Sequence, residues 1–172
     1  ESQQVCLNSP LAPITVSNIS LDFASFQWEV SEDNINFSLI EGQTGVSFTP
    51  TSQTSGVKYY RRKSTISKNG VSCAAYTNSI SITVIDLTPG EINGSQSICY
   101  GETPESFTSI VDAYAMGENV SYTWERSTDD QVTWQAFENN STTYAPGALT
   151  QTIYYRRVAT SSTCDVPKKS NI

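Results

Sequence analysis

The sequence contains the same pattern of residues twice, and this duplication limits the possible folds more than any other feature. Trp28 recurs as Trp124 and Pro50 as Pro146, each 96 residues later, and the tetrapeptide YYRR at 59–62 recurs at 154–157. A period of this length is too long for a solenoid repeat and matches one small domain with its own core. We therefore predict two tandem domains, at residues 1–87 and 88–172.

The two ends of the chain fall at different places within this pattern. The second copy opens with the lead-in 89–99, of which the first copy has about half, and the first copy closes with 77–85, where the second stops at Ile172. We expect a truncated lead-in in the first domain and a truncated final strand in the second, as in a segment of a longer array. If the chain instead ends at Ile172, the second domain exposes a groove that a strand of another subunit could fill.

Alternation of apolar and polar residues predicts an all-β protein. Apolar side chains occupy every second position in 26–30, 120–124 and 80–84, which places one face of each strand in a core. We predict two tandem Ig-like antiparallel β-sandwich domains of about seven strands each. A Pro-Gly turn in 86–91 joins them. The predicted core residues are Trp28, Trp124, Tyr60 and Tyr155.

Four cysteines, two in each copy, favour an oxidising and therefore extracellular location. Because each domain should carry a complete bond, the repeat predicts the pairs Cys6–Cys73 and Cys99–Cys164. Each bond would stabilise its domain by roughly 4 kcal/mol in the chain-entropy model. A zinc site is the competing interpretation, but no C-x-x-C pair is present.

The YYRR tetrads predict ion pairs across neighbouring strands. Arg61 or Arg62 should lie opposite Glu29. In the second copy, Arg156 or Arg157 should lie near Glu125. Such pairs contribute about 0.2 to 1 kcal/mol each, so a structural role is the first interpretation and an anion-binding site the alternative.

Charge and motifs argue against several classes of function. The net charge of −7 disfavours nucleic acid, and the absence of histidine removes the commonest general base and metal ligand. The sequence has no catalytic motif and no apolar run of the ~20 residues that span a bilayer, so we predict neither an enzyme nor a membrane-spanning segment. We expect no cofactor. Calcium at the linker, beside Asp86 and Glu91, is the single alternative, since the acidic residues of the hairpin turns are ordinary turn formers.

A family resemblance rests on several short motifs of the second copy. These are the run of Ile98, Cys99, Gly101 and Pro104, the YTW strand followed by Trp134, the segment 144–157, Cys164, and the pair Ser170 and Asn171. Together they resemble the Ig-like or PKD-like repeats of large Bacteroidetes cell-surface adhesins, of the SprB type that serves gliding motility and is exported by type IX secretion. The first copy departs from these motifs, since no glycine follows Cys6 and Phe37 replaces the second tryptophan.

The resemblance implies structural stalk or spacer repeats of a long secreted adhesin at the cell surface, used in attachment or gliding. The implied partners are neighbouring repeats of the same chain, with surface polysaccharide or other adhesin subunits as further possibilities. The alternative is an Ig-like module that binds carbohydrate or protein through loops or through exposed aromatic residues such as Tyr76, Tyr100 and Tyr114. A cluster of outward aromatic side chains would favour this alternative.

Overall fold

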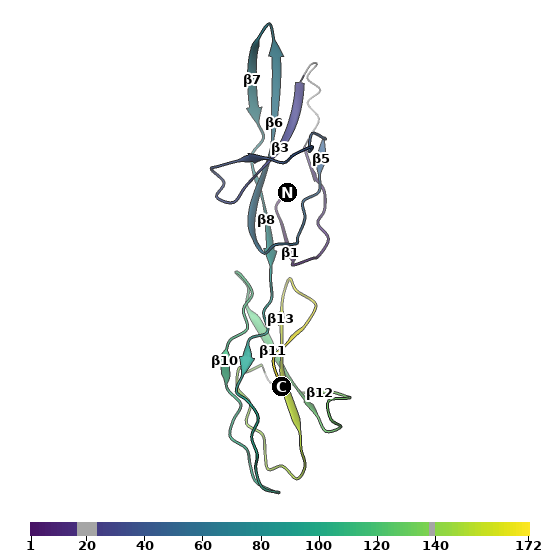
Figure 1. The fold of residues 1–172 in the computed structure, drawn as a ribbon, viewed down its shortest axis with the longest axis vertical. Coiled ribbons are helices and arrows are strands. Elements are labelled where there is room, and N and C mark those ends of the chain that lie inside the picture. Colours follow the sequence, from purple (N-terminus) through teal and green to yellow (C-terminus); the bar gives the residue numbers. More distant parts are fainter. Residues whose placement is uncertain (17–23, 138–139) are drawn as a thin grey trace. The chain divides into compact units, whose positions relative to one another are not determined.

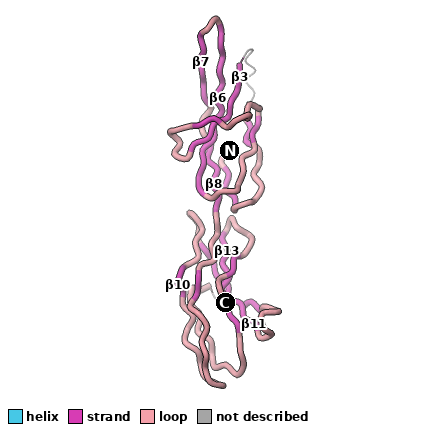
Figure 2. Tube along the Cα trace, in the orientation of Figure 1, coloured by secondary structure: helices cyan, strands magenta, loops and turns pink. Residues whose placement is uncertain are grey.

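The protein is all-β, as predicted from the alternation of apolar and polar residues. A computed structural model describes residues 1–16, 24–137 and 140–172, and these contain strands, turns and loops but no helix (Figures 1 and 2). The chain divides into two compact units, Glu1–Ile85 and Asp86–Ile172, each described by itself below.

The first unit is built around one large sheet and one small sheet. Its strands are β1 (Gln3–Cys6), β2 (Ile14–Thr15), β3 (Ala24–Ser31), β4 (Ser38–Leu39), β5 (Ser47–Phe48), β6 (Gly56–Lys68), β7 (Val71–Tyr76) and β8 (Ile80–Ile85). The large sheet has the order β1-β8-β6-β3-β4, and β7 pairs with the far part of β6. Strands β2 and β5 form the small sheet.

The 13-residue strand β6 organises this unit. It pairs antiparallel with β3 on one side, and with β8 and then β7 on the other, so that β6 and β7 form a long hairpin (Figure 1). Asn69 and Gly70 make its turn with φ of 54° and 78°, values that asparagine and glycine tolerate best and that suit a tight hairpin. Strand β8 is held on its other side by β1, which runs parallel to it.

The second unit repeats the centre of this arrangement. Its strands are β9 (Glu91–Ile92), β10 (Ser109–Val111), β11 (Val120–Ser127), β12 (Gln135–Phe137), β13 (Tyr154–Ser161) and β14 (Lys168–Lys169). One sheet has the order β12-β11-β13-β14 and the other pairs β9 with β10. Strands β11 and β13 are the counterparts of β3 and β6.

The core of each unit is a layer of aromatic rings around one tryptophan. In the first unit Phe48 lies between Trp28 and Tyr60, with ring centroids 5.9 and 5.7 Å away. In the second unit Phe107 contacts Trp124 and Tyr155 at 6.1 and 5.2 Å. The four predicted core residues are 0 to 6% exposed.

A hydrogen bond fixes the orientation of each of these tryptophans. The indole Nε1 of Trp28 donates to the carbonyl oxygen of Gly45 at 3.0 Å, and that of Trp124 donates to Ser141 at 3.0 Å. The two acceptors lie the same number of residues after their tryptophan, so the duplication extends to individual bonds. A buried indole N–H that finds a partner avoids the cost of an unsatisfied donor.

Candidate functional site

The YYRR tetrads lie on the central strands β6 and β13, where strand alternation divides each tetrad between two faces. Tyr60 and Arg62 point inward and are 6% and 3% exposed, and their counterparts Tyr155 and Arg157 are 6% and 0% exposed. The other tyrosine and arginine of each tetrad therefore lie on the outer face.

The outward arginines form the ion pairs expected from the sequence. The Arg61 Nε lies 2.8 Å from the Glu29 Oε2, its direct neighbour on β3. In the second unit the Arg156 Nε lies 2.5 Å from the Glu125 Oε2 in the same register.

An aromatic ring covers each outward guanidinium. The Arg61 guanidinium carbon lies 3.8 Å from the centre of the Phe37 ring, and that of Arg156 lies 3.7 Å from the Trp134 ring. Tyr76 also contacts Arg61, at 4.1 Å. The carboxylate at Nε and the ring over the guanidinium give these arginines a structural role in the sheet.

The sequence left open which arginine of each tetrad pairs with the glutamate, and in the structure the inward arginines, Arg62 and Arg157, do not take part in these ion pairs. Arg157 donates through Nη1 to the Ser109 hydroxyl at 2.8 Å and to the Thr142 carbonyl at 3.1 Å, and through Nη2 to the Val111 carbonyl at 3.2 Å. Its guanidinium stacks over the Tyr122 ring, 4.7 Å from its centre.

Arg62 occupies the same place in the first unit, with its guanidinium 4.2 Å from the centre of the Phe26 ring. Burial lowers the pKa of its guanidinium below the ordinary 12.5. The alternation of the strand places the two arginines of each tetrad on opposite faces of the sheet, because residues two apart on a strand share a face and adjacent residues do not.

The acidic hairpin turns are occupied by their own hydrogen bonds. The Asp33 carboxylate accepts from the backbone N–H of Asn36 at 2.7 Å and of Ile35 at 2.9 Å, and these bonds hold its pKa well below the usual value. In the second unit Asp129 accepts from the side chain and backbone of Thr133 and from Ser127, which lowers its pKa to about 2.

These bonds give the turn carboxylates a structural role. Within residues 1–16, 24–137 and 140–172, no three Asp, Glu, Cys or His side chains come together as a metal ion would need. The same residues include no helix long and apolar enough to cross a membrane.

The cysteines differ from the predicted pairing. Cys6 and Cys164 are disulfide-bonded, whereas Cys73 and Cys99 are exposed free thiols. The predicted pairs Cys6–Cys73 and Cys99–Cys164 are therefore wrong.

The geometry of the first unit explains why. Cys6 lies beside Ile85, at the end of β8 that pairs with Gly56, whereas Cys73 lies opposite Ile66, ten residues further along β6. Ten residues of strand span about 30 Å, and the Cα atoms of a disulfide lie within about 7 Å.

The second unit separates its two cysteines in the same way. Cys99 lies in a turn whose Gly101 N–H donates to the Leu149 carbonyl at 2.8 Å, before β13 begins. Cys164 lies beyond the other end of β13, after Ser161, with its backbone N–H on the Ser161 hydroxyl.

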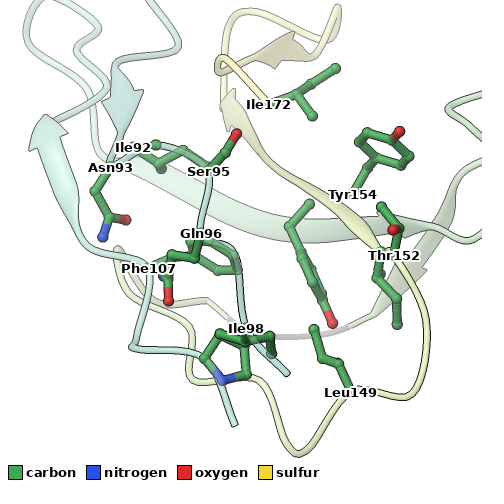
Figure 3. Close-up of a pocket in the computed structure, with 14 residues that line it drawn as sticks. Ile92, Asn93, Ser95, Gln96, Ile98, Phe107, Leu149, Thr152, Tyr154 and Ile172 are labelled. Atoms are coloured by element: carbon green, nitrogen blue, oxygen red, sulfur yellow. The ribbon is translucent and has the colours of Figure 1, made fainter. Parts of the chain in front are cut away.

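The second unit has an apolar groove beside the start of β13 (Figure 3). One wall is the segment 92–98 and the other is 152–155, and Figure 3 shows Ile98 and Leu149 near one end and Ile172 near the other. None of the residues that line it is charged. They are Ile92, Asn93, Gly94, Ser95, Gln96, Ile98, Pro104, Phe107, Leu149, Thr152, Ile153, Tyr154, Tyr155 and Ile172.

The exposed aromatic residues considered for recognition each have different neighbours within their own unit. Tyr76, 50% exposed, belongs to the ion-pair cluster of the first unit. In the second unit Tyr100, 83% exposed, lies in the turn beside Leu149, and Tyr114, 61% exposed, forms a bridge with Thr88.

Comparisons with known proteins identify a family for both units and a fold for the chain. The model of DUF8696, a domain of unknown function, matches residues 1–86 and again residues 88–172. No curated protein matches the chain.

Two solved structures resemble the chain in fold. A structure of domains A168–A170 of titin has a TM-score of 0.50 at 14% identity over 99% of this chain. The three N-terminal domains of the highly immunogenic outer capsid protein (Hoc) of bacteriophage RB49 have a TM-score of 0.51 at 11% identity over 98% of it. The chain spans 60% and 63% of these two chains, respectively. At these identities the likeness concerns the fold, which agrees with the predicted tandem Ig-like β-sandwiches.

Proposed function

The chain belongs to the DUF8696 family of domains of unknown function, and we propose that it supplies structural spacer repeats of a long, secreted cell-surface adhesin. The observation that carries the proposal is that one set of structural bonds is built twice. Each unit has its own buried tryptophan bonded to a carbonyl, its own Glu–Arg pair and its own buried arginine.

The polar residues of the chain support a structural rather than a catalytic role. The charged side chains that are prominent in the sequence are engaged by their own unit: the outward arginines by glutamate and a ring, the turn aspartates by backbone N–H groups. The disulfide-bonded state of Cys6 and Cys164 supports an extracellular location, since such bonds persist in oxidising compartments. Attachment or gliding motility, and export by type IX secretion, are the roles that the sequence resemblance adds.

A swap experiment in the parent protein tests the spacer role. Residues 1–172 are replaced by two unrelated Ig-like domains of similar length, and surface attachment and gliding of the cells are compared with a strain in which the segment is deleted. A spacer predicts that the swap restores what the deletion impairs, because only length matters. Failure of the swap, with equal surface amounts of both proteins on labelled intact cells, contradicts the proposal.

A recognition module is the second candidate, and the apolar groove of the second unit is the observation that favours it. Binding of the isolated chain to specific members of a glycan array would establish a carbohydrate-binding module and refute the pure spacer. The uncharged lining, with several aliphatic side chains, suits an apolar ligand better than a sugar.

A further inference from the structure

We propose that the outer edge of β7 pairs antiparallel with β7 of a second copy of this chain, and that the two Cys73 residues then form a disulfide bond across the two-fold axis. The strand VSCAAY, residues 71–76, carries this contact. Such a lateral contact goes beyond the proposed spacer role and does not depend on it.

Strand β7 has an edge to which no strand is paired. Within residues 1–16, 24–137 and 140–172, it pairs with β6 only, with which it forms the long hairpin (Figure 1). All six of its residues are exposed. An exposed edge presents N–H and C=O groups at the spacing that another strand needs, which makes it a site for strand addition.

The hairpin turn determines which backbone groups of β7 face β6. A two-residue turn at 69–70 closes with a hydrogen-bonded pair, here Lys68 and Val71. At the other end of β7, the N–H of Thr77 donates to the Arg62 carbonyl at 3.0 Å. Because hydrogen-bonded positions alternate along an antiparallel pair, both ends indicate that the backbone groups of the odd-numbered residues of β7 face β6.

The even-numbered residues Ser72, Ala74 and Tyr76 therefore direct their N–H and C=O groups to the free edge. When two copies meet about a two-fold axis at Cys73, Ser72 lies opposite Ala74 of the second copy. These two residues exchange N–H···O=C bonds, and the axis repeats the exchange on its other side. The outward groups thus pair in this register without any change in the β6–β7 hairpin.

The same register brings the two thiols together. Cys73 uses its backbone groups toward β6, so it occupies a non-hydrogen-bonded position opposite Cys73 of the second copy. Cα atoms at such positions lie about 4.5 Å apart, within the range of about 4.4–6.8 Å found in disulfides. Moving the axis by one residue places Cys73 opposite Val71 or Ala75 instead. The disulfide therefore selects one register.

The side chains of β7 are compatible with pairing of the strand to itself. On the face that carries Cys73, Val71 lies opposite Ala75 of the second copy, and Ile66 of β6 is the direct neighbour of Cys73. Val71 and Ile66 are 66% and 37% exposed in the single chain, so the contact covers apolar surface. No residue of β7 is charged, so no like charges meet between the paired strands.

The second unit protects the corresponding edge. Its strand β14 is the counterpart of β7, because Ser170 bonds to both backbone groups of Arg157 as Thr77 does to those of Arg62. Both residues of β14 are exposed lysines. Short edge strands and lysines are devices by which proteins prevent strand addition. Strand β7 has six residues and no lysine, so it has neither device.

The bond requires an oxidant, for which we specify a small-molecule disulfide such as oxidised glutathione. Cys73 is an exposed free thiol in the single chain. Its thiolate attacks one sulfur of the oxidant, which gives a mixed disulfide and releases one thiolate. Cys73 of the second copy then loses its proton and attacks the protein sulfur of the mixed disulfide, which releases the second thiolate. The two cysteines lose two electrons, and the oxidant is reduced to two thiols.

The test compares the two free thiols of the chain. Cys99→Ser leaves Cys73 as the free thiol, and Cys73→Ser leaves Cys99, which is also exposed. Each chain is treated with a stoichiometric amount of oxidised glutathione, covalent dimers are followed on non-reducing gels, and the linked peptides are identified by mass spectrometry. We expect dimers linked through Cys73 to form at least tenfold faster than dimers linked through Cys99.

A proline at the edge tests the strand pairing. Ala74→Pro, in the Cys99→Ser chain, removes an outward N–H that the second copy needs and leaves the bonds to β6 in place. Ala74→Ser is the matched control, because it keeps this N–H. We expect dimer formation to slow at least tenfold with proline and to change less than twofold with serine.

A charge exchange tests the register and does not depend on how the hairpin tolerates proline. In the Cys99→Ser background, one chain carries Ser72→Lys and Ala74→Lys, and another carries Ser72→Glu and Ala74→Glu. Like charges face each other when either chain pairs with itself, so each should dimerise at least tenfold more slowly. A mixture of the two chains should recover the original rate, and this recovery also shows that the hairpin is folded in both.

Three results would each overturn the proposal. These are equal rates for Cys73 and Cys99, Cys73-linked dimers that are unaffected by Ala74→Pro, and a mixture of the charged chains that forms dimers no faster than either chain alone. A chain that stays monomeric under the same conditions also overturns it, since β7 would then have a different partner or none.

Discussion

Substitution of Trp124 by phenylalanine should destabilise the second unit by an amount that the structure allows us to work out. Trp124 is 0% exposed, and its indole Nε1 donates to the Ser141 carbonyl at 3.0 Å. Phenylalanine keeps an aromatic ring but removes the donor, which leaves a partly buried carbonyl without that partner at a cost of about 1–3 kcal/mol. The smaller ring also gives up roughly 40 Å² of apolar contact, or about 1 kcal/mol.

The expected loss in the free energy of unfolding is therefore about 2–4 kcal/mol. Urea denaturation followed by circular dichroism measures it, and with a slope of about 2 kcal/mol/M the midpoint should fall by about 1–2 M. Trp28→Phe should cause a similar loss in the first unit, because its Nε1 makes the equivalent bond to Gly45 at 3.0 Å.

Trp134→Phe is the control within the second unit. Its Nε1 also donates to a carbonyl, that of Gln131 at 3.2 Å, but in an exposed turn where water can replace the lost donor. We expect a loss below about 1 kcal/mol. A loss below 1 kcal/mol for Trp124→Phe, or equal losses at the two tryptophans, would refute the reasoning that the buried indole bond holds the core together.

Three further predictions concern a turn, a close backbone contact and the thiols. Hydrogen bonds lower the pKa of Asp129 to about 2 in the folded state, so its contribution to stability is present above the unfolded pKa of about 3.9 and is lost as the pH falls towards 2. In acid titrations, the free energy of unfolding of Asp129→Asn should therefore fall less steeply between about pH 3.9 and pH 2 than that of the unsubstituted protein. Gly90→Ala should destabilise the second unit by about 2–4 kcal/mol in urea denaturation, because a Cβ there would lie 2.2 Å from the Val111 carbonyl oxygen and φ is +69°. Alkylation without reductant, read by peptide mass spectrometry, should modify Cys73 and Cys99 and spare the other two cysteines; modification of all four would contradict the bonding described above.

The duplication in the sequence was sufficient to predict tandem all-β domains and a pair between each glutamate and an arginine of YYRR, but not which of the two arginines. The alternation around Trp28 and Trp124 places the tryptophans in the core, and the residue next to each tryptophan, Glu29 or Glu125, then lies on the outer face. A guanidinium on the neighbouring strand meets this carboxylate because the two residues are in register. Local periodicity fixes such contacts.

The buried arginines could not be predicted in the same way. A charged residue at an inward position normally argues against burial. Arg157 is tolerated because the Ser109 hydroxyl and the carbonyls of Thr142 and Val111 accept from its guanidinium. These groups come from segments 15 to 48 residues away, whose arrangement exists only in the folded sheet.

The disulfide prediction failed because it assumed that Cys73 follows YYRR closely in space. The sequence does contain a signal against this assumption, since Asn69 and Gly70 form a typical hairpin turn between YYRR and the cysteine. In a hairpin with this turn, Cys73 pairs with Ile66, close to the turn and far from the YYRR tetrad's start. Symmetry between repeats is thus a weaker guide to cysteine pairing than the length of the strand between them.

The two arginine roles found in each unit also bear on how such a chain can evolve. The Glu–Arg pair and the tryptophan–carbonyl bond of each unit are made by residues of that unit, and the guanidinium of each buried arginine contacts a ring of its own unit, Phe26 or Tyr122. A gene duplication of one unit therefore carries a complete set of these contacts with it. Copy number can change by recombination between repeats without any compensating substitution in the cores that are already there.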